Sequence, residues 1–439
     1  MTDTPHAIDP QAFVRWMREA SPYMRAHRGH TFVIHLGGEL VADPGFAQLI
    51  QDLALLTGIG VKLVIVHGCR PQASARIAAA GLDSRYVGHL RVTDALALTH
   101  VKDAAAAVRF TLEAQFAHAT RIRPAGAAAL RITGGNFIMA RPAGIIEGVD
   151  LEFTGEIRRI DAPAISAQLT LVDVVLLSPL AYSPTGETFS LSAVDLATAV
   201  AIELSASKLI FLELDAQVLD ATGTLVRQLT PREARAEHYT GAGCRLLVHA
   251  VRACQFGVER VHLINAAEGG LLLELFTRDG IGTLLSNTPF DQLRSATIED
   301  VGGILDLLEP LETAGVLVKR SREKLETEID HFMVMVRDGA TVACGALYPF
   351  ATEQAAEIAG IAVEPHYRRH GFGRALLAAL EAQAQALRLT RVFVLTTQAT
   401  HWFEEHGYQR TSFDELPTAR QKLYNFQRNS QVLFKALEI

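Results

Sequence analysis

The sequence predicts two successive α/β domains, a three-layer domain with a mostly parallel sheet and then a smaller mixed α/β domain. The chain has 439 residues, a length that suits two or three domains. Its first part alternates short Val/Ile/Leu runs with alanine-rich stretches, the pattern of α/β domains with a parallel sheet. A change of composition at residues 286–290 separates this pattern from a different one, which contains a hairpin signal.

Continuous apolar runs define the first domain, which we expect to span residues 1–286. Such runs suit strands that are buried on both faces of a sheet. The predicted strands are residues 31–36, 62–66, 171–177, 209–212 and 261–264. Between them, residues 72–80 and 104–117 are alanine-rich and have apolar residues at helical spacing, so we predict helices there.

The second domain is predicted at residues 293–439, after a linker at residues 287–292. Two runs joined by Asp338-Gly339 form a strong hairpin signal. The predicted strands are residues 331–337, 341–348, 357–363, 391–396 and 431–437, with a helix at residues 374–387.

The composition argues against several classes of protein. Hydrophobic residues make up 49% of the chain and charged residues 20%, which is ordinary for globular domains. A net charge of −7 gives no electrostatic reason to expect nucleic acid. The first residues lack the features of a signal peptide, and no apolar run is long enough to span a membrane. The four cysteines show no metal-binding spacing, so we expect a cytoplasmic protein with buried thiols and no metal.

The most informative segment follows the strand predicted at residues 357–363. It reads Arg368-Arg369-His370-Gly371-Phe372-Gly373 and leads into a helix from Arg374. Glycines let the backbone approach a pyrophosphate, and the new helix offers N–H groups and the positive end of its dipole. Arginine adds positive charge and can donate two parallel hydrogen bonds to a phosphate. An anion site is therefore predicted, with a plain structural turn as the alternative; the dinucleotide pattern G-x-G-x-x-G fails at Leu376.

The segment resembles the acetyl-CoA site of the GCN5-related N-acetyltransferases. That family's pattern is arginine or glutamine, two residues, glycine, one residue, and glycine or alanine, which Arg368, Gly371 and Gly373 meet. The resemblance implies acetyl-CoA as the co-substrate. The positions that it implies for acetyl-CoA binding are Ile361, Ala362, Val363, Arg368, Arg369, His370, Gly371, Gly373 and Arg374.

The first domain resembles the amino-acid kinase fold, in its N-acetylglutamate-binding branch. Gly37-Gly38 and Gly280-Ile281-Gly282-Thr283 carry this resemblance. Kinases of the family have a lysine two residues before the glycine pair, where it neutralises phosphate oxygens, and this chain has His35 there. Of the family's asparagine-rich stretch ending in aspartate, only Asp195 is kept. Phosphoryl transfer is therefore not expected.

The order of the two domains resembles that of the bacterial N-acetylglutamate synthase family. The resemblance covers nearly the whole chain and implies transfer of the acetyl group of acetyl-CoA to the α-amine of L-glutamate, the first step of arginine biosynthesis. It also implies feedback by L-arginine and a hexamer assembled through a long N-terminal helix. The positions that it implies for arginine are Lys208, Glu274 and Gly282; a surface carboxylate is the alternative for Glu274.

Amide formation from a thioester requires a neutral amine and therefore a nearby general base. Glu357 lies on the strand that leads to the glycine loop, and its counterpart in the family is a base that acts through water. Thr396, at the end of the next strand, could hold that water. An ion-paired or solvent-facing Glu357 and a Thr396 selected for strand fit are the alternatives. Many related acetyltransferases have a tyrosine that protonates the leaving thiolate, and this chain has Phe403 at that position.

The two carboxylates of a glutamate substrate call for cations and directed N–H or O–H donors. By position, the resemblance implies substrate contacts at Leu317, Lys319, Arg428 and Ser430; a solvated charge run is the alternative for Lys319. Three other functions stay open: a bifunctional synthase and kinase, a ligand sensor without turnover, and a transferase for another amino acid.

Overall fold

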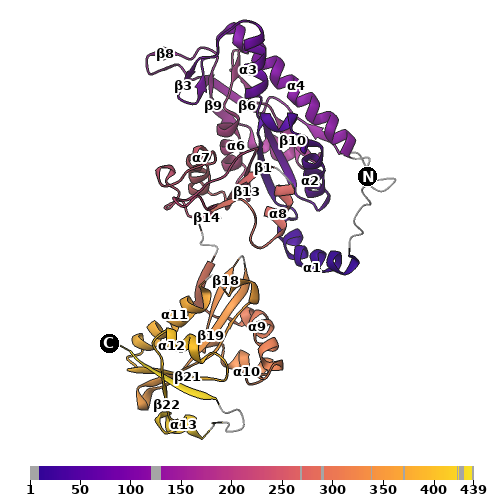
Figure 1. Cartoon of the computed structure of the whole chain (residues 1–439). Helices are drawn as coiled ribbons and strands as arrows, with labels where there is room; N and C mark the ends of the chain where they lie inside the picture. Colours follow the sequence, from indigo (N-terminus) through magenta and orange to yellow (C-terminus); the bar gives the residue numbers. More distant parts are fainter. Residues whose placement is uncertain are drawn as a thin grey trace, which may run out of the picture. The chain divides into compact units, whose positions relative to one another are not determined.

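The chain divides between Pro289 and Phe290 into two units, which we describe separately. The structure is a computed structural model (Figure 1). It describes residues 9–119, 130–266, 269–287, 291–337, 339–368, 371–422, 424 and 430–437. Of the predicted linker, Asp291 and Gln292 lie in strand β17 (Asp291–Ser295), which pairs within the second unit.

An eight-stranded sheet forms the centre of the N-terminal unit, with the order β14-β16-β15-β13-β1-β2-β10-β5. All neighbouring strands are parallel except β15 and β16. The strands are β1 (Thr31–Leu36), β2 (Lys62–His67), β5 (Ile132–Thr133), β10 (Val174–Leu177), β13 (Lys208–Glu213), β14 (Gln228–Leu229), β15 (Arg260–Asn265) and β16 (Thr283–Ser286). The five strands predicted for this domain are confirmed, although β10 begins three residues later than expected.

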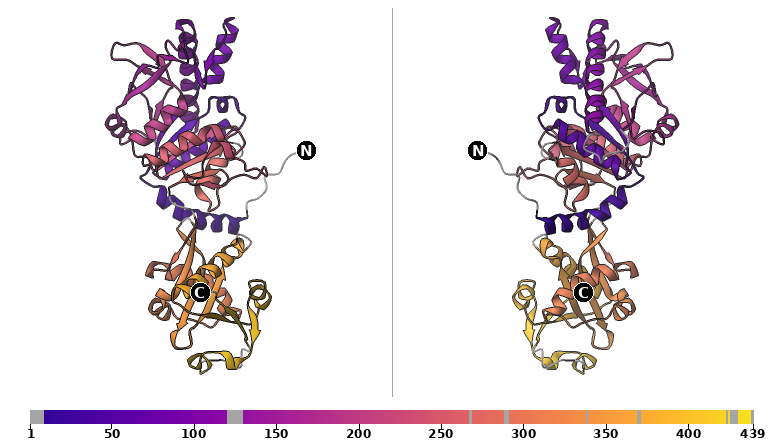
Figure 2. Two further views of the ribbon diagram at one scale, coloured as in Figure 1. Left: turned by 90° about the vertical axis from the view of Figure 1, so that its left-hand side faces the viewer. Right: turned by 90° about the vertical axis from the view of Figure 1, so that its right-hand side faces the viewer.

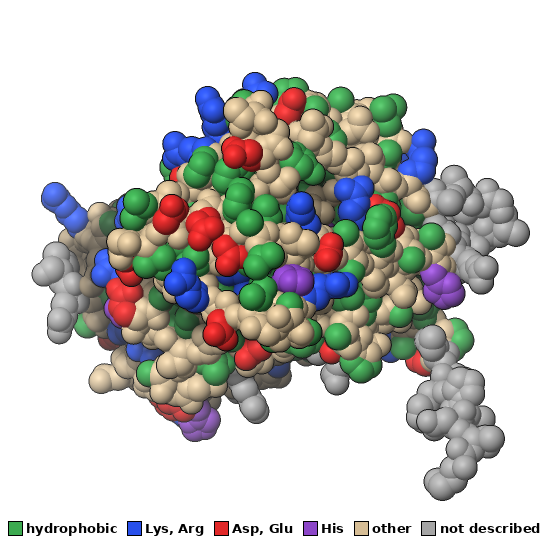
Figure 3. Space-filling view, turned by 90° about the horizontal axis from the view of Figure 1, so that it is seen from above, with side chains coloured by type: hydrophobic (Ala, Val, Ile, Leu, Met, Phe, Trp, Pro, Cys, Tyr) green, Lys and Arg blue, Asp and Glu red, His purple; other side chains and the backbone are tan. Residues whose placement is uncertain are grey.

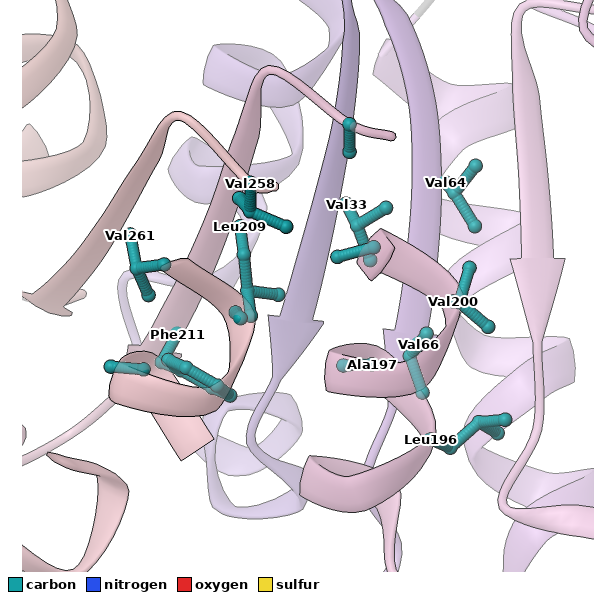
Figure 4. Close-up of a cluster of buried hydrophobic side chains, with 14 of the residues drawn as sticks. Val33, Val64, Val66, Leu196, Ala197, Val200, Leu209, Phe211, Val258 and Val261 are labelled. Carbon is teal, nitrogen blue, oxygen red and sulfur yellow. The ribbon is translucent and has the colours of Figure 1, made fainter. Parts of the chain in front are cut away.

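Helices cover both faces of this sheet, as the alternating side chains of the strands require. Val33 and neighbouring side chains pack against α6 on one face, and Ile34 and its neighbours pack on the other face, where α2, α4 and α8 lie. Figure 4 shows Val33, Val64 and Val66 on the α6 side. Each such burial contributes roughly 1.5–3 kcal/mol. The helices are α1 (Pro10–His27), α2 (Phe46–Gly58), α3 (Arg70–Ala79), α4 (Ala95–Ala119), α5 (Ala162–Gln168), α6 (Ala193–Glu203), α7 (Cys244–Gln255) and α8 (Gly270–Phe276).

A second, small sheet in this unit was not predicted. Its order is β12-β11-β6-β9, and Figure 2 shows it (magenta to pink) beside the main sheet. Its strands are β6 (Ile138–Pro142), β9 (Gly155–Ile160), β11 (Leu180–Tyr182) and β12 (Thr188–Ser190); the hairpins β3 (Tyr86–Val87)–β4 (Leu90–Arg91) and β7 (Ile145–Ile146)–β8 (Val149–Asp150) are also extra. These strands are short and partly polar, so they lack the long apolar runs that identify buried strands.

The C-terminal unit contains a seven-stranded sheet with the order β17-β18-β19-β20-β21-β23-β22. Its strands after β17 are β18 (Phe332–Arg337), β19 (Ala340–Phe350), β20 (Ala355–Val363), β21 (Arg391–Thr396), β22 (Gln409–Thr411) and β23 (Gln431–Ala436). The helices are α9 (Val301–Thr313), α10 (Arg322–Thr327), α11 (Phe372–Ala386), α12 (Thr400–Glu405) and α13 (Thr418–Gln421). The predicted hairpin is confirmed as β18–β19, and β20 and β21 are parallel.

Two irregularities of β20 shape this sheet. β20 pairs with β21 only over its first three residues, up to Glu357 opposite Phe393. Beyond Glu357 the pairing with β19 also shifts, because Ala359 pairs with Ala346 whereas Ala362 pairs with Cys344. Gly360 lies in this bulge with a φ of +64°, a conformation that favours glycine.

Candidate active site

The glycine loop leads directly into α11, as the sequence predicts. Gly371 precedes the helix with a φ of +79°, in the left-handed region. The N–H groups of a helix's first turn have no partner within the helix. Arg368 and Arg374 are exposed on either side of the turn, and Arg369 and His370 lie outside the described residues.

The second glycine of the pattern faces the end of β20. A Cβ on Gly373 would lie 3.6 Å from Val363 Cγ2 and 3.5 Å from Trp402 Cζ2, which are ordinary contacts. The helix start therefore lies next to the strand end that contains Ile361, Ala362 and Val363. Ala362 packs into the buried cluster that contains α9 residues, whereas Ile361 and Val363 pack in clusters with α11 residues.

Glu357 is buried and ion-paired. Its Oε2 accepts a hydrogen bond of 2.6 Å from Arg420 Nε, and its Oε1 accepts one of 3.1 Å from Arg420 Nη2. Tyr348 pairs with Glu357 across β19 and β20, and its hydroxyl donates to Glu328 Oε2 at 2.8 Å. Burial and this hydrogen bond raise the pKa of Tyr348. The ion pair was one of the alternatives that the sequence left open for Glu357.

Arg320 is the residue that sequence reasoning missed at this site. Its Nη1 is buried, has no hydrogen-bond partner among the described residues, and lies 3.5 Å from the position of a Cβ on Gly360. Lys319, the predicted contact, is exposed, and Leu317 is half-buried against the α9 cluster. Lys319 and Arg320 are adjacent cations in the sequence, so only the fold shows which of them faces β20.

Thr396 lies elsewhere on the same sheet, at the end of β21, and Ser430 directly precedes β23. Thr396 Oγ1 accepts hydrogen bonds from the backbone N–H groups of Gln398 (3.3 Å) and Ala399 (2.9 Å). Thr396 is three residues beyond the strand partner of Glu357, which is about 10 Å of strand, and no described hydrogen bond joins the two. Ser430 is half-buried before β23, and Arg428 lies outside the described residues.

Phe403 is buried in the core of the unit. Its ring packs against Trp402 and Tyr408, with ring centroids 4.9 and 5.3 Å apart. The position that provides an acid in many related enzymes is therefore part of the hydrophobic core here.

The residues predicted for arginine lie in a buried polar cluster of the N-terminal unit. Glu274 Oε2 accepts hydrogen bonds from the N–H groups of Ile281 (2.7 Å) and Gly282 (2.8 Å), and its Oε1 lies 2.7 Å from His262 Nδ1. Lys208 is buried close enough for its charge to lower the pKa values of His27 and His262. The surface alternative for Glu274 is wrong, because its side chain is only 5% exposed.

The charge state of this cluster follows from burial and hydrogen bonding. Burial alone would raise the pKa of Glu274, but hydrogen bonds from His262 and the two N–H groups outweigh it, and the pKa falls to about 2. Burial lowers the pKa of His262. We therefore assign an ionised Glu274 that accepts a hydrogen bond from the Nδ1–H of a neutral His262.

His35 occupies the position of the kinase lysine as a neutral side chain. It is buried at the end of β1, with Nδ1 3.7 Å from Glu213 Oε1, and burial lowers its pKa to about 3. Glu213 is also ion-paired with Arg245. At neutral pH His35 has no charge with which to neutralise phosphate oxygens.

Comparison with known proteins identifies both units. Residues 30–265 match the amino acid kinase family, and residues 303–408 match the acetyltransferase (GNAT) family. An amino-acid acetyltransferase of Azotobacter vinelandii is 50% identical over 430 residues, which are 97% of this chain and 99% of the relative. The N-acetylglutamate synthase of Neisseria gonorrhoeae, crystallised with coenzyme A and L-arginine, is 39% identical over 97% of this chain and 100% of that chain, with a TM-score of 0.89. The chain belongs to the N-acetylglutamate synthase family.

As an N-acetylglutamate synthase family member, the chain is an acyltransferase of the amino-acid acetyltransferase class, with acetyl-CoA as its co-substrate. The same Neisseria gonorrhoeae enzyme, crystallised with coenzyme A and N-acetyl-glutamate, has a TM-score of 0.62 at 39% identity over 97% of this chain and 100% of that chain.

Three further observations describe this family member. Among the described residues, no group of three or more His, Cys, Asp or Glu side chains is arranged to hold a metal ion. None of the described helices combines the length and the apolar character that crossing a membrane requires. On the face shown in Figure 3, basic and acidic side chains are interspersed.

Proposed function

We propose that the chain transfers the acetyl group of acetyl-CoA to the α-amine of L-glutamate, giving N-acetyl-L-glutamate and CoA, under control by L-arginine. The observation that carries glutamate as the acceptor is the buried Nη1 of Arg320 beside Glu357's strand, which has no hydrogen-bond partner in the part of the chain that the structure describes. A buried guanidinium nitrogen without a partner costs free energy unless a ligand satisfies it, and a carboxylate fits it best. Arg428 and Ser430 are proposed as further contacts, and Lys319 and Leu317 as flanking ones.

In this proposal the glycine loop and the start of α11 hold the pyrophosphate of acetyl-CoA. Arg368, Arg374, Gly371 and Gly373 define this site together with Arg369, His370 and the strand end 361–363. Backbone N–H groups near Val363 would polarise the thioester carbonyl. The amine nitrogen forms the new bond to the carbonyl carbon, and the C–S bond breaks to release the thiolate.

The proton that the amine must lose is assigned to Glu357, directly or through one water. A carboxylate can serve as a general base when it lies within hydrogen-bond reach of the proton or of one bridging water. Glu357 is 11% exposed, so it is reachable from one side. Thr396 is proposed to support the bound water by donating its hydroxyl hydrogen, since its oxygen already accepts two N–H groups.

The buried cluster of Lys208, His262, Glu274 and Gly282 is proposed as the place where L-arginine acts. The synthase of Neisseria gonorrhoeae was crystallised with L-arginine, which supports an arginine site in this family. Glu274 already accepts three hydrogen bonds, so a bound guanidinium would have to add to or replace them. Regulation requires that arginine bind one state of the enzyme better than another.

We also propose a homo-oligomer, a hexamer, in the cytoplasm. Helix α1 exposes large apolar side chains, with Phe13 and Trp16 each 54% and Met17 45% exposed. Asp9 caps this helix and Pro10 begins it, so its start is well defined. An apolar helix face of this kind gains free energy when a second copy covers it. All four cysteines are free thiols, which suits a reducing compartment.

The test is release of free thiol from acetyl-CoA, measured with and without L-glutamate and L-arginine. We expect release that requires glutamate and changes with arginine. Release with another amino acid but not with glutamate would reassign the acceptor, and no release with any amino acid would favour a ligand sensor. Acyl phosphate formed from ATP and N-acetyl-L-glutamate would reveal kinase activity despite the neutral His35.

A further inference from the structure

Arg420 holds both carboxylate oxygens of Glu357. Arg420 is on the short helix α13 (Figure 1), 63 residues after Glu357 of β20 in the sequence. Its Nε and Nη2 donate to Oε2 and Oε1 of Glu357 at 2.6 and 3.1 Å, so two N–H groups of one guanidinium face two oxygens of one carboxylate. The side chains are 21% and 11% exposed, which leaves the pair accessible from one side.

Two further charged side chains, Glu328 and Arg320, lie near Tyr348, the strand partner of Glu357. Glu328 accepts the hydroxyl hydrogen of Tyr348 at 2.8 Å and has Lys324 Nζ at 3.7 Å. Glu357 accepts two hydrogen bonds from Arg420. Arg320 is a further charged group near Tyr348. Its backbone N–H donates to Glu312 Oε1 at 3.0 Å, and its Nη1 has no hydrogen-bond partner among the described residues. The carboxylates of Glu328 and Glu357 therefore each accept hydrogen bonds, whereas the Nη1 of Arg320 has no acceptor among the described residues.

This pairing opposes the proposed role of Glu357. A carboxylate that accepts a bidentate pair of hydrogen bonds from a guanidinium is held by those two donors in one orientation. Each oxygen of Glu357 uses one of its lone pairs for Arg420, so a water or an amine must use the remaining lone pairs or displace the guanidinium. Glu357 can turn toward the acceptor amine only after Arg420 has a different partner.

A dicarboxylate acceptor could provide that partner. The planar guanidinium fits any carboxylate in the same way, so an acceptor carboxylate can take the place of Glu357 without loss of hydrogen bonds at Arg420. An acceptor with one carboxylate can satisfy Arg320 but then has no second carboxylate for Arg420. An acceptor with two carboxylates can satisfy both arginines.

We propose that Arg420 is a specificity and positioning residue that exchanges the carboxylate of Glu357 for a carboxylate of the acceptor. The base is then released only when a dicarboxylate acceptor is bound. This inference rests on the proposed function, in which Glu357 is the base and the acceptor is a dicarboxylate amino acid. If the exchange occurs, an acceptor with two carboxylates is preferred in kcat as well as in KM.

The test compares glutamate with its near-isosteric amide, glutamine, in the full-length Arg420→Met variant. Loss of the bidentate donor should raise the KM for glutamate roughly 10- to 100-fold, the range for charge-assisted hydrogen bonds. The kcat with glutamine should rise, because Glu357 no longer needs to be released. The ratio of kcat/KM for glutamate over glutamine should therefore fall at least about tenfold. An unchanged ratio would overturn the proposal.

Two further variants separate this role from a structural one. Arg410→Met removes an ion pair with the same Nε–Oε distance, 2.6 Å to Glu404, in the same unit, and should leave the ratio unchanged. Arg420→Lys keeps the charge but loses the planar fork, so its ratio should lie between those of the wild type and Arg420→Met. A fall of the ratio in Arg410→Met equal to that in Arg420→Met would assign the effect to general loss of stability.

The base role is tested on its own by Glu357→Gln. If this variant turns over normally, the proposed base is wrong and the exchange falls with it. If Glu357→Gln is slow but Arg420→Met keeps the wild-type ratio, only the exchange is wrong. A double variant combines Glu357→Gln with Arg420→Met. In it, the Arg420→Met change should no longer increase the kcat with glutamine, because no base remains to be released.

Discussion

The guanidinium of Arg320 lies against Gly360, with Nη1 3.5 Å from the position that a Cβ would occupy. Gly360 is in the bulge of β20, three residues beyond Glu357, and its backbone has a positive φ. The bulge thereby places a cation next to the strand of the proposed base. Two residues that are far apart in the sequence meet because one strand has an extra residue.

Replacing Arg320 with alanine should raise the KM for glutamate roughly 10- to 100-fold, since a charge-assisted hydrogen bond to the acceptor is lost. The KM for acetyl-CoA should change little. Lys319→Ala is the matched control, because Lys319 is the adjacent cation but is exposed. Steady-state kinetics with both substrates would check this, and a larger effect at Lys319 than at Arg320 would contradict our assignment.

Replacing Glu357 with glutamine should lower kcat by about 10²- to 10⁴-fold, the usual contribution of a general base. The amide keeps the shape of the side chain, so the affinity for acetyl-CoA should be close to that of the wild type. Single-turnover rates and acetyl-CoA titrations of the purified variant would measure the two quantities. Turnover near the wild-type level would remove Glu357 from the mechanism.

The two glycines before and within α11 should respond differently to alanine. Gly371 has a φ of +79°, and an alanine there would cost roughly 1–2 kcal/mol of backbone strain. A Cβ on Gly373 would meet only ordinary contacts at 3.5 and 3.6 Å. We expect Gly371→Ala to raise the KM for acetyl-CoA several-fold and Gly373→Ala to have a much smaller effect. The reverse order would show that close approach to the ligand at Gly373, and not backbone conformation at Gly371, sets the glycine requirement.

Acid should destabilise the N-terminal unit through its buried histidines. Burial lowers the pKa of His27 and His67 to about 4 and of His35 to about 3, below the ordinary value of 6.5. Above pH 6.5 these groups are neutral in both states and add no pH dependence. As the pH falls from 6.5 toward 4, the unfolded chain binds protons that the native chain does not, so each histidine removes about 1.4 kcal/mol per pH unit.

Urea unfolding at pH 7 and pH 5 measures this loss. A His35→Gln variant should lose less stability between the two pH values than the wild type does. His401→Gln should lose as much as the wild type, because the His401 side chain is 89% exposed. Equal losses in all three proteins would show that His35 does not contribute.

L-arginine should raise the melting temperature of the wild-type chain, because a ligand that binds only the native state stabilises it in proportion to RT ln(1 + [L]/Kd). Glu274→Gln should abolish this rise, each variant being compared with its own value without arginine. Differential scanning fluorimetry over an arginine series would check it. An undiminished rise in Glu274→Gln would place the arginine site elsewhere.

Much of the fold was predictable because buried parallel strands have continuous apolar runs. Residues 31–36 and 391–396 were predicted with the bounds that β1 and β21 have. The small sheet of the N-terminal unit was missed, since strands such as β9 carry charged residues and have no apolar run. Local pattern identifies strands through burial, and partly exposed strands show it weakly.

The candidate site was only partly predictable from the sequence. The glycine loop is local, so the turn into a helix was predicted, although α11 begins at Phe372, two residues earlier than expected. The partners of Glu357 and the choice between Lys319 and Arg320 depend on the fold, because they bring together α13, β20 and the segment before α10. The same holds for His262, whose hydrogen bond to Glu274 depends on how β15 and α8 pack together.

The early end of the pairing between β20 and β21 has a consequence for the co-substrate. The paired residues of β20 and β21 end at Glu357 and Phe393, so the later residues of the two strands are not joined in this ladder. In the proposed complex, the amide-containing arm of CoA would form hydrogen bonds with these backbone groups as a neighbouring strand does. The sheet would then be continuous only while the co-substrate is bound.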